Sequence, residues 1–299
     1  MEYIILDLEW NGAYSKQHGR FINEIIEFGA VKLDEQLQEM DCFQIFVKSR
    51  LTKRLCERFK MLTNISNEEM ASGVDFAEAV ERYTRWAGPD ALTLSWSDTD
   101  VRVLLDNVRS FLGMQTIPCI GKYADLQKYL QRRLGITGNQ ISLAAAAEHM
   151  QVDTAEFSAH RALDDSRLCA ALLRREFDPA LLAEYTRDTR RPDYYARLDF
   201  KPYFISDLTH PDIDKNELRF RCEVCGKFAR RTTKWQFRSK AFRAAFRCRN
   251  CGAEFMGRVR FQKLYDGVRV KRWTAPLPEP AQEDGAQRQP EPAGAQNEA

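Results

Sequence analysis

The N-terminal stretch Tyr3-Ile4-Ile5-Leu6-Asp7-Leu8-Glu9-Trp10 combines a short apolar run with two acids. Its β-branched and leucine content predicts a strand. Because alternate side chains of a strand point to the same face, Asp7 and Glu9 would project together. Two carboxylates among apolar neighbours are costly to bury without a cationic partner, and Mg²⁺ or Mn²⁺ prefers oxygen ligands. The pair fits a metal site, although a solvated acidic strand face would show the same pattern.

The segments that follow predict a mixed α/β domain. Strands are expected at Tyr3–Leu8, Glu24–Leu33, Asp41–Val47, Ala91–Ser95 and Ile117–Ile120. Helical spacing of apolar residues predicts helices near 76–87, 100–112, 126–134, 143–150 and 162–177. Strands first, and then strands mixed with helices, favour an α/β fold around a mixed β-sheet flanked by helices.

Two later segments place acids near helix starts. Asp98 and Asp100 follow a predicted strand and open a helix, where acids are favourable. Either could face a metal ion, or one could cap the helix while the other is solvated. His160 precedes a predicted helix that carries Asp165. A lone histidine is more often a structural hydrogen-bonding group than a base.

Together these segments resemble the three exonuclease motifs of the DEDD superfamily, in its histidine-bearing branch. Asp7 and Glu9 match the opening Asp-x-Glu, and His160, Ala162 and Asp165 match the third motif, His-x-Ala-x-x-Asp. The resemblance covers about residues 1–177 and includes a stretch like the family's second strand, Asn23–Val31. It implies a ribonuclease-H-like fold.

The second motif of the family maps onto Asp100, with Asp98 as the second choice. The tyrosine-bearing branch would place a tyrosine where this chain has Arg161. Trp10 departs from the small residue that is common after the motif glutamate. Its ring could stack on a terminal base, or it could be a core residue.

The resemblance implies a metal-dependent 3′→5′ exonuclease that acts on single-stranded RNA or DNA 3′ ends. It implies two Mg²⁺ or Mn²⁺ ions, one to generate the attacking hydroxide and one to stabilise the leaving oxygen. Their ligands would be Asp7, Glu9, Asp100 and Asp165. His160 would be the general base. RNA is favoured over DNA, because a stand-alone chain with a basic module resembles an RNA-processing factor more than a polymerase subunit.

Four of the eight cysteines form two close pairs, Cys222/Cys225 and Cys248/Cys251, each followed by a glycine. Two Cys-x-x-Cys turns predict a closed tetrahedral site for one Zn²⁺. Such a site has no open coordination position, so the zinc would be structural. The pattern predicts a small four-cysteine zinc ribbon.

The chain has a formal charge of only +2, but the charge is unevenly distributed. Residues 215–272 contain 18 Lys and Arg against 4 Asp and Glu, whereas residues 1–214 contain 26 against 34. A basic module with interleaved aromatic residues fits single-stranded nucleic acid, although about half of the aromatics should form the core. The cations predicted to bind nucleic acid are Arg230, Arg231, Lys234, Arg238, Lys240 and Arg243. Alternatively, the module docks a protein.

The expected organisation is an exonuclease domain at 1–177, a connector at 178–214, a basic zinc-ribbon module at 215–273 and a disordered tail at 274–299. The sequence predicts a cytoplasmic protein without a membrane partner, since it shows neither a signal peptide nor a bilayer-spanning apolar segment. The oligomeric state stays open, a homodimer included. The competing hypothesis is a catalytically inactive nucleic-acid-binding or regulatory protein that uses the exonuclease fold and the zinc ribbon.

Overall fold

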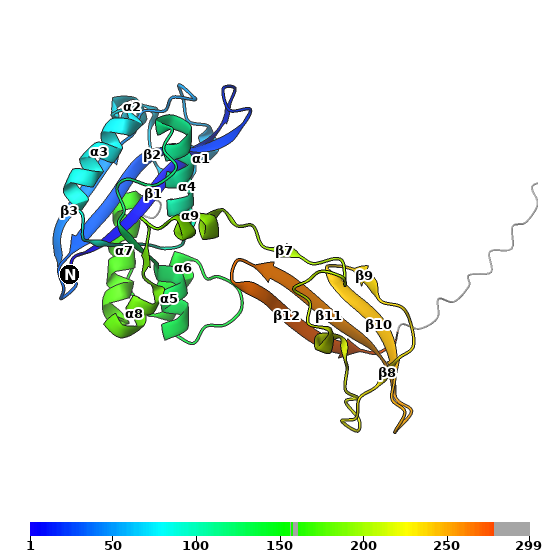
Figure 1. Ribbon diagram of the computed structural model, residues 1–299. Helices are drawn as coiled ribbons and strands as arrows, with labels where there is room; N and C mark the ends of the chain where they lie inside the picture. Colours follow the sequence, from blue (N-terminus) through cyan, green and yellow to red (C-terminus); the bar gives the residue numbers. More distant parts are fainter. Residues whose placement is uncertain (156, 158–160, 278–299) are drawn as a thin grey trace, which may run out of the picture. The chain divides into compact units, whose positions relative to one another are not determined.

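The computed structural model describes residues 1–155, 157 and 161–277 (Figure 1). The chain divides into two compact units, unit 1 (Met1–Asp199) and unit 2 (Phe200–Ala299). Among the helices of the described residues, none has the length and apolar content needed to cross a bilayer.

Unit 1 is built on a mixed sheet, in which the described residues form six strands in the order β3-β2-β1-β4-β5-β6. These strands are β1 (Tyr3–Ser15), β2 (Arg20–Leu33), β3 (Glu39–Phe46), β4 (Leu92–Ser95), β5 (Lys122–Asp125) and β6 (Arg187–Asp188). Strands β1 to β3 form an antiparallel meander, β1, β4 and β5 run parallel, and β6 is antiparallel to β5. Because β1 pairs with β4 only over Tyr3–Ile5, the β1 residues that follow Ile5 lie beside the carboxyl end of β4.

Helices cover both faces of this sheet (Figure 1). One face packs against α3 (Phe76–Ala87), α4 (Thr99–Asn107), the π-helical turn η1 (Val108–Leu112) and α9 (Pro192–Asp199). The other packs against α5 (Leu126–Arg133), α6 (Leu143–His149), α7 (Ala162–Arg175) and α8 (Pro179–Tyr185). Two short helices, α1 (Glu57–Thr63) and α2 (Asn67–Ser72), precede α3. The expected mixed sheet flanked by helices is therefore confirmed.

Helix α7 approaches the sheet closely because β2 has a glycine beneath it. A Cβ atom at Gly29 would lie 2.2 Å from backbone atoms of Ala162 and Leu163, so any larger residue would push the helix away. The hydroxyl of Ser166 donates a hydrogen bond to the Gly29 carbonyl oxygen at 3.0 Å. Because Gly29 is the register partner of Asp7 on β1, this close packing sets the first turn of α7 over that acid.

Two expectations about local structure differ from what is observed. The strand expected at Ile117–Ile120 is wrong: these residues form turns, and β5 begins at Lys122. Pro118 lies inside that apolar run and has no N–H for a sheet hydrogen bond. The stretch 178–214, expected to be a connector with room for a helix at Pro179–Tyr185, contains β6 and α9 in addition to that helix, α8, within unit 1. The helical spacing of Tyr194, Tyr195 and Leu198 buries α9 on the sheet.

Unit 2 is an antiparallel β-structure whose main sheet has the order β12-β11-β10-β8. Its elements are β7 (Tyr203–Phe204), the 3₁₀ turn η2 (Lys215–Leu218), β8 (Arg230–Arg231), β9 (Gln236–Arg238), β10 (Ala241–Arg247), β11 (Glu254–Leu264) and β12 (Gly267–Ala275). Phe220, Phe242 and Phe246 are buried in its core, whereas Phe228 and Phe237 are exposed. The tail expected to be disordered lies outside the described residues from 278 onward.

Candidate active site and cysteine centre

Three acids from two distant segments meet at the carboxyl end of the apolar run on β1. One carboxylate oxygen each from Asp7, Glu9 and Asp165 lie within 4.8 Å of one another, and all three residues are half-buried. Alternation along β1 explains the first two, because Tyr3 and Ile5 share their face and pack into the core beneath α7. Helix α7 supplies the third. The sheet register also shifts just after Glu9, a local irregularity of the kind that often occurs beside active sites.

Asp100 joins this cluster, and Asp98 does not. Asp100 is 5% exposed, and its Oδ1 accepts a hydrogen bond from the Leu8 backbone N–H at 3.3 Å. It lines a cavity of about 330 Å³ together with the three clustered acids. Asp98 lies 3.1 Å from Arg102 and 3.6 Å from Lys128 in ion pairs. Among these two acids, the geometry places only Asp100 in the cavity with the cluster.

Burial and mutual repulsion oppose ionisation of the clustered acids. Burial, followed by the charges of Asp100 and Glu9, raises the pKa of Asp7 well above its ordinary value. Burial and neighbouring carboxylates raise the pKa of Glu9 to about 8, and burial raises the pKa of Asp100 to about 7. A cation placed among these groups would favour their charged forms.

A fifth acid behind the cluster, Glu27 on β2, was not singled out from the sequence. It is fully buried opposite Glu9 in the β1–β2 register, and its charge contributes to the raised pKa of Glu9. Its Oε1 accepts hydrogen bonds from Gln44 Nε2 at 2.7 Å and Arg161 Nη2 at 3.3 Å. Its Oε2 is buried and has no hydrogen-bond partner among the described residues. The available signal was Glu27 as the single acid inside the apolar run IIEFGAV (residues 25–31).

The remaining residues expected at this site are His160 and Trp10. His160 lies outside the described residues. Trp10 lines the 330 Å³ cavity, as do Phe59 and Leu62, and also packs against the core beneath α3 and α4. This position is compatible with both roles considered for Trp10 from the sequence, stacking on a terminal base and packing in the core.

The acidic cluster fits hard divalent cations. Its donors are carboxylate oxygens, which is the ligand type that Mg²⁺ and Mn²⁺ prefer. Among the described residues, the charges of Asp165, Glu27 and Asp100 raise the pKa of Glu9 and that of Arg161 lowers it, so carboxylates dominate the surroundings of Glu9. The unpartnered Glu27 oxygen points to the same shortage of positive charge. The group could hold metal ions.

The four paired cysteines of unit 2 form a second candidate metal centre. The sulfurs of Cys222 and Cys251 are 3.5 Å apart, and those of Cys225 and Cys248 are 3.4 Å apart. These distances are too long for disulfides, whose sulfurs lie about 2.0 Å apart. They are close to the roughly 3.8 Å that separates sulfurs around a tetrahedral zinc with bonds of about 2.3 Å. The cluster fits a zinc ribbon.

The two cysteine turns have the same backbone geometry. Gly226 N–H donates to the Cys222 carbonyl oxygen at 2.8 Å, and Gly252 N–H donates to the Cys248 carbonyl oxygen at 2.9 Å. Both glycines have positive φ, +71° and +77°, which glycine adopts at little cost. Backbone hydrogen bonds, chiefly the one from the Cys251 N–H, lower the pKa of Cys248 to about 6, although burial acts in the opposite direction. The lower pKa favours the thiolate, which is the form that binds metal.

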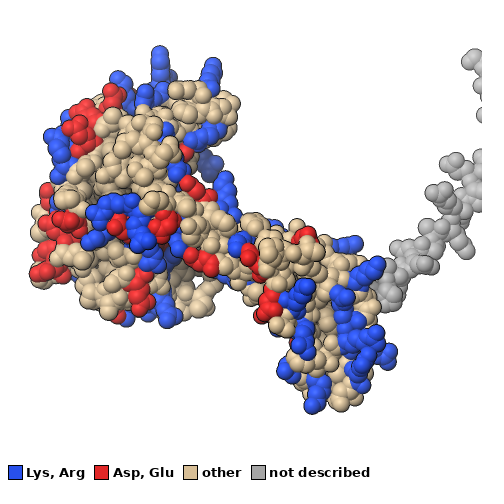
Figure 2. Space-filling model, viewed as in Figure 1, with Lys and Arg blue, Asp and Glu red and all other residues tan. Residues whose placement is uncertain are grey.

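Lys and Arg side chains are spread in groups over the visible face of unit 2 and outnumber Asp and Glu there (Figure 2). A cavity of about 550 Å³ beside the second cysteine turn is lined by Arg230, Arg231, Arg247 and Arg249. Lys234, Arg238 and Lys240 are exposed, while Arg243 on β10 is half-buried. The Lys240 ammonium also lies 5.2 Å from the ring centroid of Phe204.

Comparison with known proteins connects unit 1 to nucleases. The chain shares the fold of the nuclease domain of 3′hExo, described as a DEDDh family member bound to rAMP, with 21% identity, a TM-score of 0.50, and coverage of 57% of this chain and 90% of that one. Cell-death related nuclease 4 (CRN-4) matches with 20% identity and a TM-score of 0.50, over 58% of this chain and 62% of that one. No curated protein sequence matches significantly. Residues 4–173 match the sequence profile of the exonuclease family RNase_T, which spans more than half of the chain, and the chain therefore belongs to this exonuclease family.

Proposed function

We propose that the protein is a metal-dependent 3′→5′ exonuclease that hydrolyses phosphodiester bonds at the 3′ end of single-stranded nucleic acid, RNA in preference to DNA. The observation that carries the proposal is the convergence of Asp7, Glu9 and Asp165 within 4.8 Å of one another. Asp100 lines the same cavity, so the acids of all three expected motifs meet there.

The proposed metal ligands are Asp7, Glu9, Asp100 and Asp165. Two Mg²⁺ or Mn²⁺ ions bound to them would supply activated water and charge stabilisation for the leaving oxygen. The protein's part is to hold the ligands rigidly before substrate arrives. The close packing of α7 on Gly29 fixes Asp165, and the Leu8 N–H fixes one oxygen of Asp100. Preorganised charge of this kind is what stabilises a transition state.

Two further residues complete the proposal. His160 acts as the general base, because an imidazole titrates close to working pH. Trp10 stacks on the terminal base, since its ring lines the same cavity as the acids. Phe59 and Leu62 supply an apolar part of the cavity wall.

Substitution of one acid tests the catalytic proposal. Purified protein with Mn²⁺ is incubated with 5′-labelled single-stranded RNA and DNA of equal sequence. Wild-type protein should shorten both from the 3′ end to give a ladder, RNA faster. Asp7→Ala should release nucleotides at least about a thousandfold more slowly, because it removes a ligand of the activating cations.

The matched control for that experiment is Asp106→Ala. Asp106 is an acid of α4 that pairs with Arg20 at 2.6 Å, outside the acidic cluster, and its loss should leave release unchanged. An active Asp7→Ala protein would reject the mechanism. Wild-type protein that binds the strands without releasing nucleotides would instead favour the inactive binding protein.

The proposal extends to unit 2, with Zn²⁺ in the four-cysteine centre and nucleic acid on its basic surface. The four arginines around the 550 Å³ cavity support this, since each guanidinium can contact phosphate. Replacing Arg230 and Arg231 with glutamine should weaken binding at low salt. It should also reduce the slope of log K against log[salt] by about one for each lost phosphate contact. An unchanged slope would favour protein docking by this surface.

A further inference from the structure

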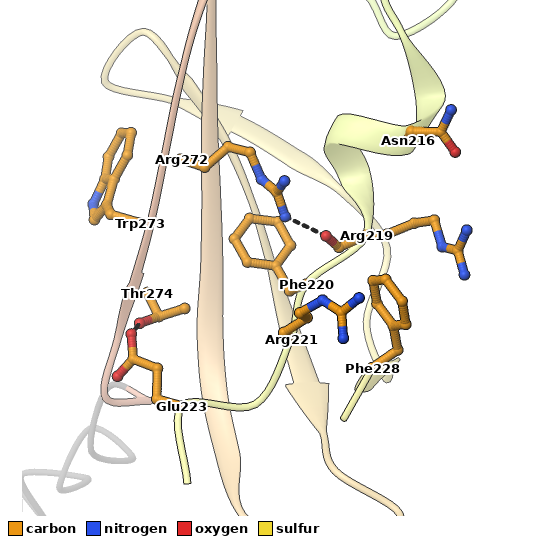
Figure 3. Close-up of a pocket in the computed structure, with 9 residues that line it drawn as sticks. All are labelled: Asn216, Arg219, Phe220, Arg221, Glu223, Phe228, Arg272, Trp273 and Thr274. Carbon is orange, nitrogen blue, oxygen red and sulfur yellow. Dashed lines mark hydrogen bonds between the residues drawn. The ribbon is translucent and has the colours of Figure 1, made fainter. Parts of the chain in front are cut away.

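Unit 2 has a second cavity, on the side of the first cysteine turn, which none of the expected binding residues line. Its volume is about 570 Å³, within the range of about 300–1,000 Å³ that is typical of small-molecule sites. The lining residues come from the segment around η2, from the first cysteine turn and from β12 (Figure 3). They are Asn216, Arg219, Phe220, Arg221, Glu223, Phe228, Arg272, Trp273 and Thr274.

One wall of this cavity is an exposed phenylalanine held by two arginines. Phe228 is 47% exposed, although most phenylalanines of unit 2 lie in its core. The guanidinium carbons of Arg219 and Arg221 lie 4.4 and 4.1 Å from its ring centroid. Contacts this short are cation–π stacks, so the two planar guanidinium groups lie over the Phe228 ring as layers of one stack. We call these three residues the Phe228 stack.

A second stack lies beside the first. The Arg272 guanidinium carbon is 4.9 Å from the ring centroid of the buried Phe220. Arg272 also donates to the backbone oxygen of Arg219, which ties β12 to the segment that carries the Phe228 stack (Figure 3). The Trp273 ring points to the opposite side of β12 from Arg272, so it is not part of either stack (Figure 3).

The charges of the cavity are unequally paired. Arg272 forms an ion pair with Glu217 at 3.3 Å, and the one acid that lines the cavity, Glu223, accepts a hydrogen bond from Thr274. Arg221 donates to the Gly226 carbonyl oxygen at 3.1 Å. Among the described residues, the Arg219 guanidinium stacks on Phe228 but forms no hydrogen bond or ion pair. Its donors are therefore free for an anion at the edge of the stack.

We propose that this cavity is a binding subsite for one unpaired nucleotide of a single-stranded nucleic acid. The base stacks on the Phe228 stack, and the adjoining phosphate pairs with Arg219. Aromatic rings and guanidinium planes both stack on unpaired bases, and arginine pairs with phosphate. The inference rests on the proposed function, since it assumes that the strand is the substrate of the exonuclease.

A nucleotide fits these features better than an acidic peptide. An acidic peptide would use the guanidinium groups but would gain nothing from an exposed ring. A base without a phosphate would leave Arg219 unpaired. Of these ligands, only a nucleotide has both a flat π-system to lie on the Phe228 stack and an anionic group to pair with Arg219.

The test is a binding experiment on the full, zinc-loaded chain, without added Mg²⁺ or Mn²⁺. Affinity is measured for a labelled 12-nucleotide single strand and for the same strand with several internal abasic sites. Phe228→Ala should weaken binding of the intact strand by roughly 5- to 100-fold, the loss expected for one stacked base. It should leave binding of the abasic strand nearly unchanged, because that strand has no base to lose.

Two variants control for structure. Phe237→Ala removes another exposed phenylalanine of unit 2, 38% exposed on β9 and outside this cavity, and should bind both strands like wild-type protein. Phe228→Tyr keeps the ring and should restore affinity for the intact strand. The zinc content of each variant reports whether unit 2 is folded. Wild-type protein should bind the abasic strand more weakly than the intact strand, and this difference supports base stacking independently of any variant.

Several outcomes would overturn the subsite. The first is that Phe228→Ala binds the intact strand as tightly as wild-type protein. The second is that Phe228→Ala loses equal affinity for the intact and the abasic strand. The third is that a poly-glutamate peptide binds as tightly as the intact strand and depends equally on Phe228. Nucleotide release from the same strand separates the two proposals. If wild-type protein releases nucleotides and Phe228→Ala binds normally, the subsite is wrong and the exonuclease stands. If wild-type protein neither binds nor releases, the proposed function itself fails.

Discussion

The acidic cluster of unit 1 and the cysteine cluster of unit 2 could both hold metal ions, but they are assembled in different ways. Cys222 and Cys225 lie in one tight turn, and Cys248 and Cys251 lie in another with the same backbone hydrogen bonds. The acids come from a strand and two helices, and they meet only when the whole sheet of unit 1 has formed.

The two clusters also differ in what supports them. The acids stand beside two extensive apolar cores, whereas unit 2 has one smaller core. Its cysteines lie in two turns, one before β8 and one between β10 and β11. A small unit with a modest core commonly depends on a metal for its fold. We therefore expect the fold of unit 2 to need its metal, and the fold of unit 1 to tolerate the loss of metal.

The largest expected effect is at the cysteines. Cys248→Ser should abolish zinc binding and unfold unit 2, because structural zinc contributes an apparent free energy of about 10–16 kcal/mol, comparable with the stability of a whole domain. Zinc content and limited proteolysis measure both consequences. Cys42→Ser, at an exposed cysteine of β3, should change neither. A zinc-free Cys248→Ser protein that still resists proteolysis in unit 2 would remove the contrast between the sites.

The next effect concerns which acid of the second motif serves the metal site. Asp100→Asn should reduce kcat/KM for nucleotide release roughly a thousandfold, about 4 kcal/mol, while leaving the fold intact. Asp98→Asn should reduce kcat/KM less than about tenfold, because Asp98 pairs with Arg102 and Lys128 outside the cluster. Thermal melting of both variants shows whether folding is preserved. The reverse order of activities would assign the second motif to Asp98.

The sequence was sufficient wherever chemistry follows from local spacing. The alternation of β1 predicted that Asp7 and Glu9 share a face, and the cysteine spacing predicted a four-sulfur cluster. The residue pattern alone left Asp98 and Asp100 open, and the family resemblance favoured Asp100. The structural distinction depends on the Leu8 N–H, a group about ninety residues away that only the folded sheet brings to Asp100.

Other features escaped the sequence because their signals were short or non-local. Helices α1 and α2 have seven and six residues, too few to show a helical period. Glu27 lies in an apolar run, and its role follows only from its register with Glu9 and its pairing with Arg161. The Phe228 stack joins residues on both sides of a cysteine turn, and sequence alone does not tell which aromatics of a ribbon are exposed.

The smallest expected effect is the response of unit 1 to pH when Mg²⁺ and Mn²⁺ are absent. The pKa of Glu9 is raised to about 8 and that of Asp100 to about 7, so the folded state holds protons that the unfolded state has released. Stability is then greatest near the pKa values of the unfolded acids and falls as pH rises toward those of the folded protein. Between pH 6 and 8 the free energy of unfolding should fall by about 1–2 kcal/mol for each of these two acids.

Mn²⁺ should reverse this trend, because it binds the deprotonated carboxylates and competes with protons. The rise in melting temperature on adding Mn²⁺ should therefore be larger at pH 8 than at pH 6. Glu9→Gln removes one titrating group and should flatten the metal-free dependence, whereas Asp106→Asn, at the exposed Arg20 pair, should not. If metal-free wild-type protein became more stable from pH 6 to 8, cations of the protein itself would already compensate the negative charges of the acids. The contrast between a metal-requiring unit 2 and a metal-tolerant unit 1 would then need a different electrostatic explanation.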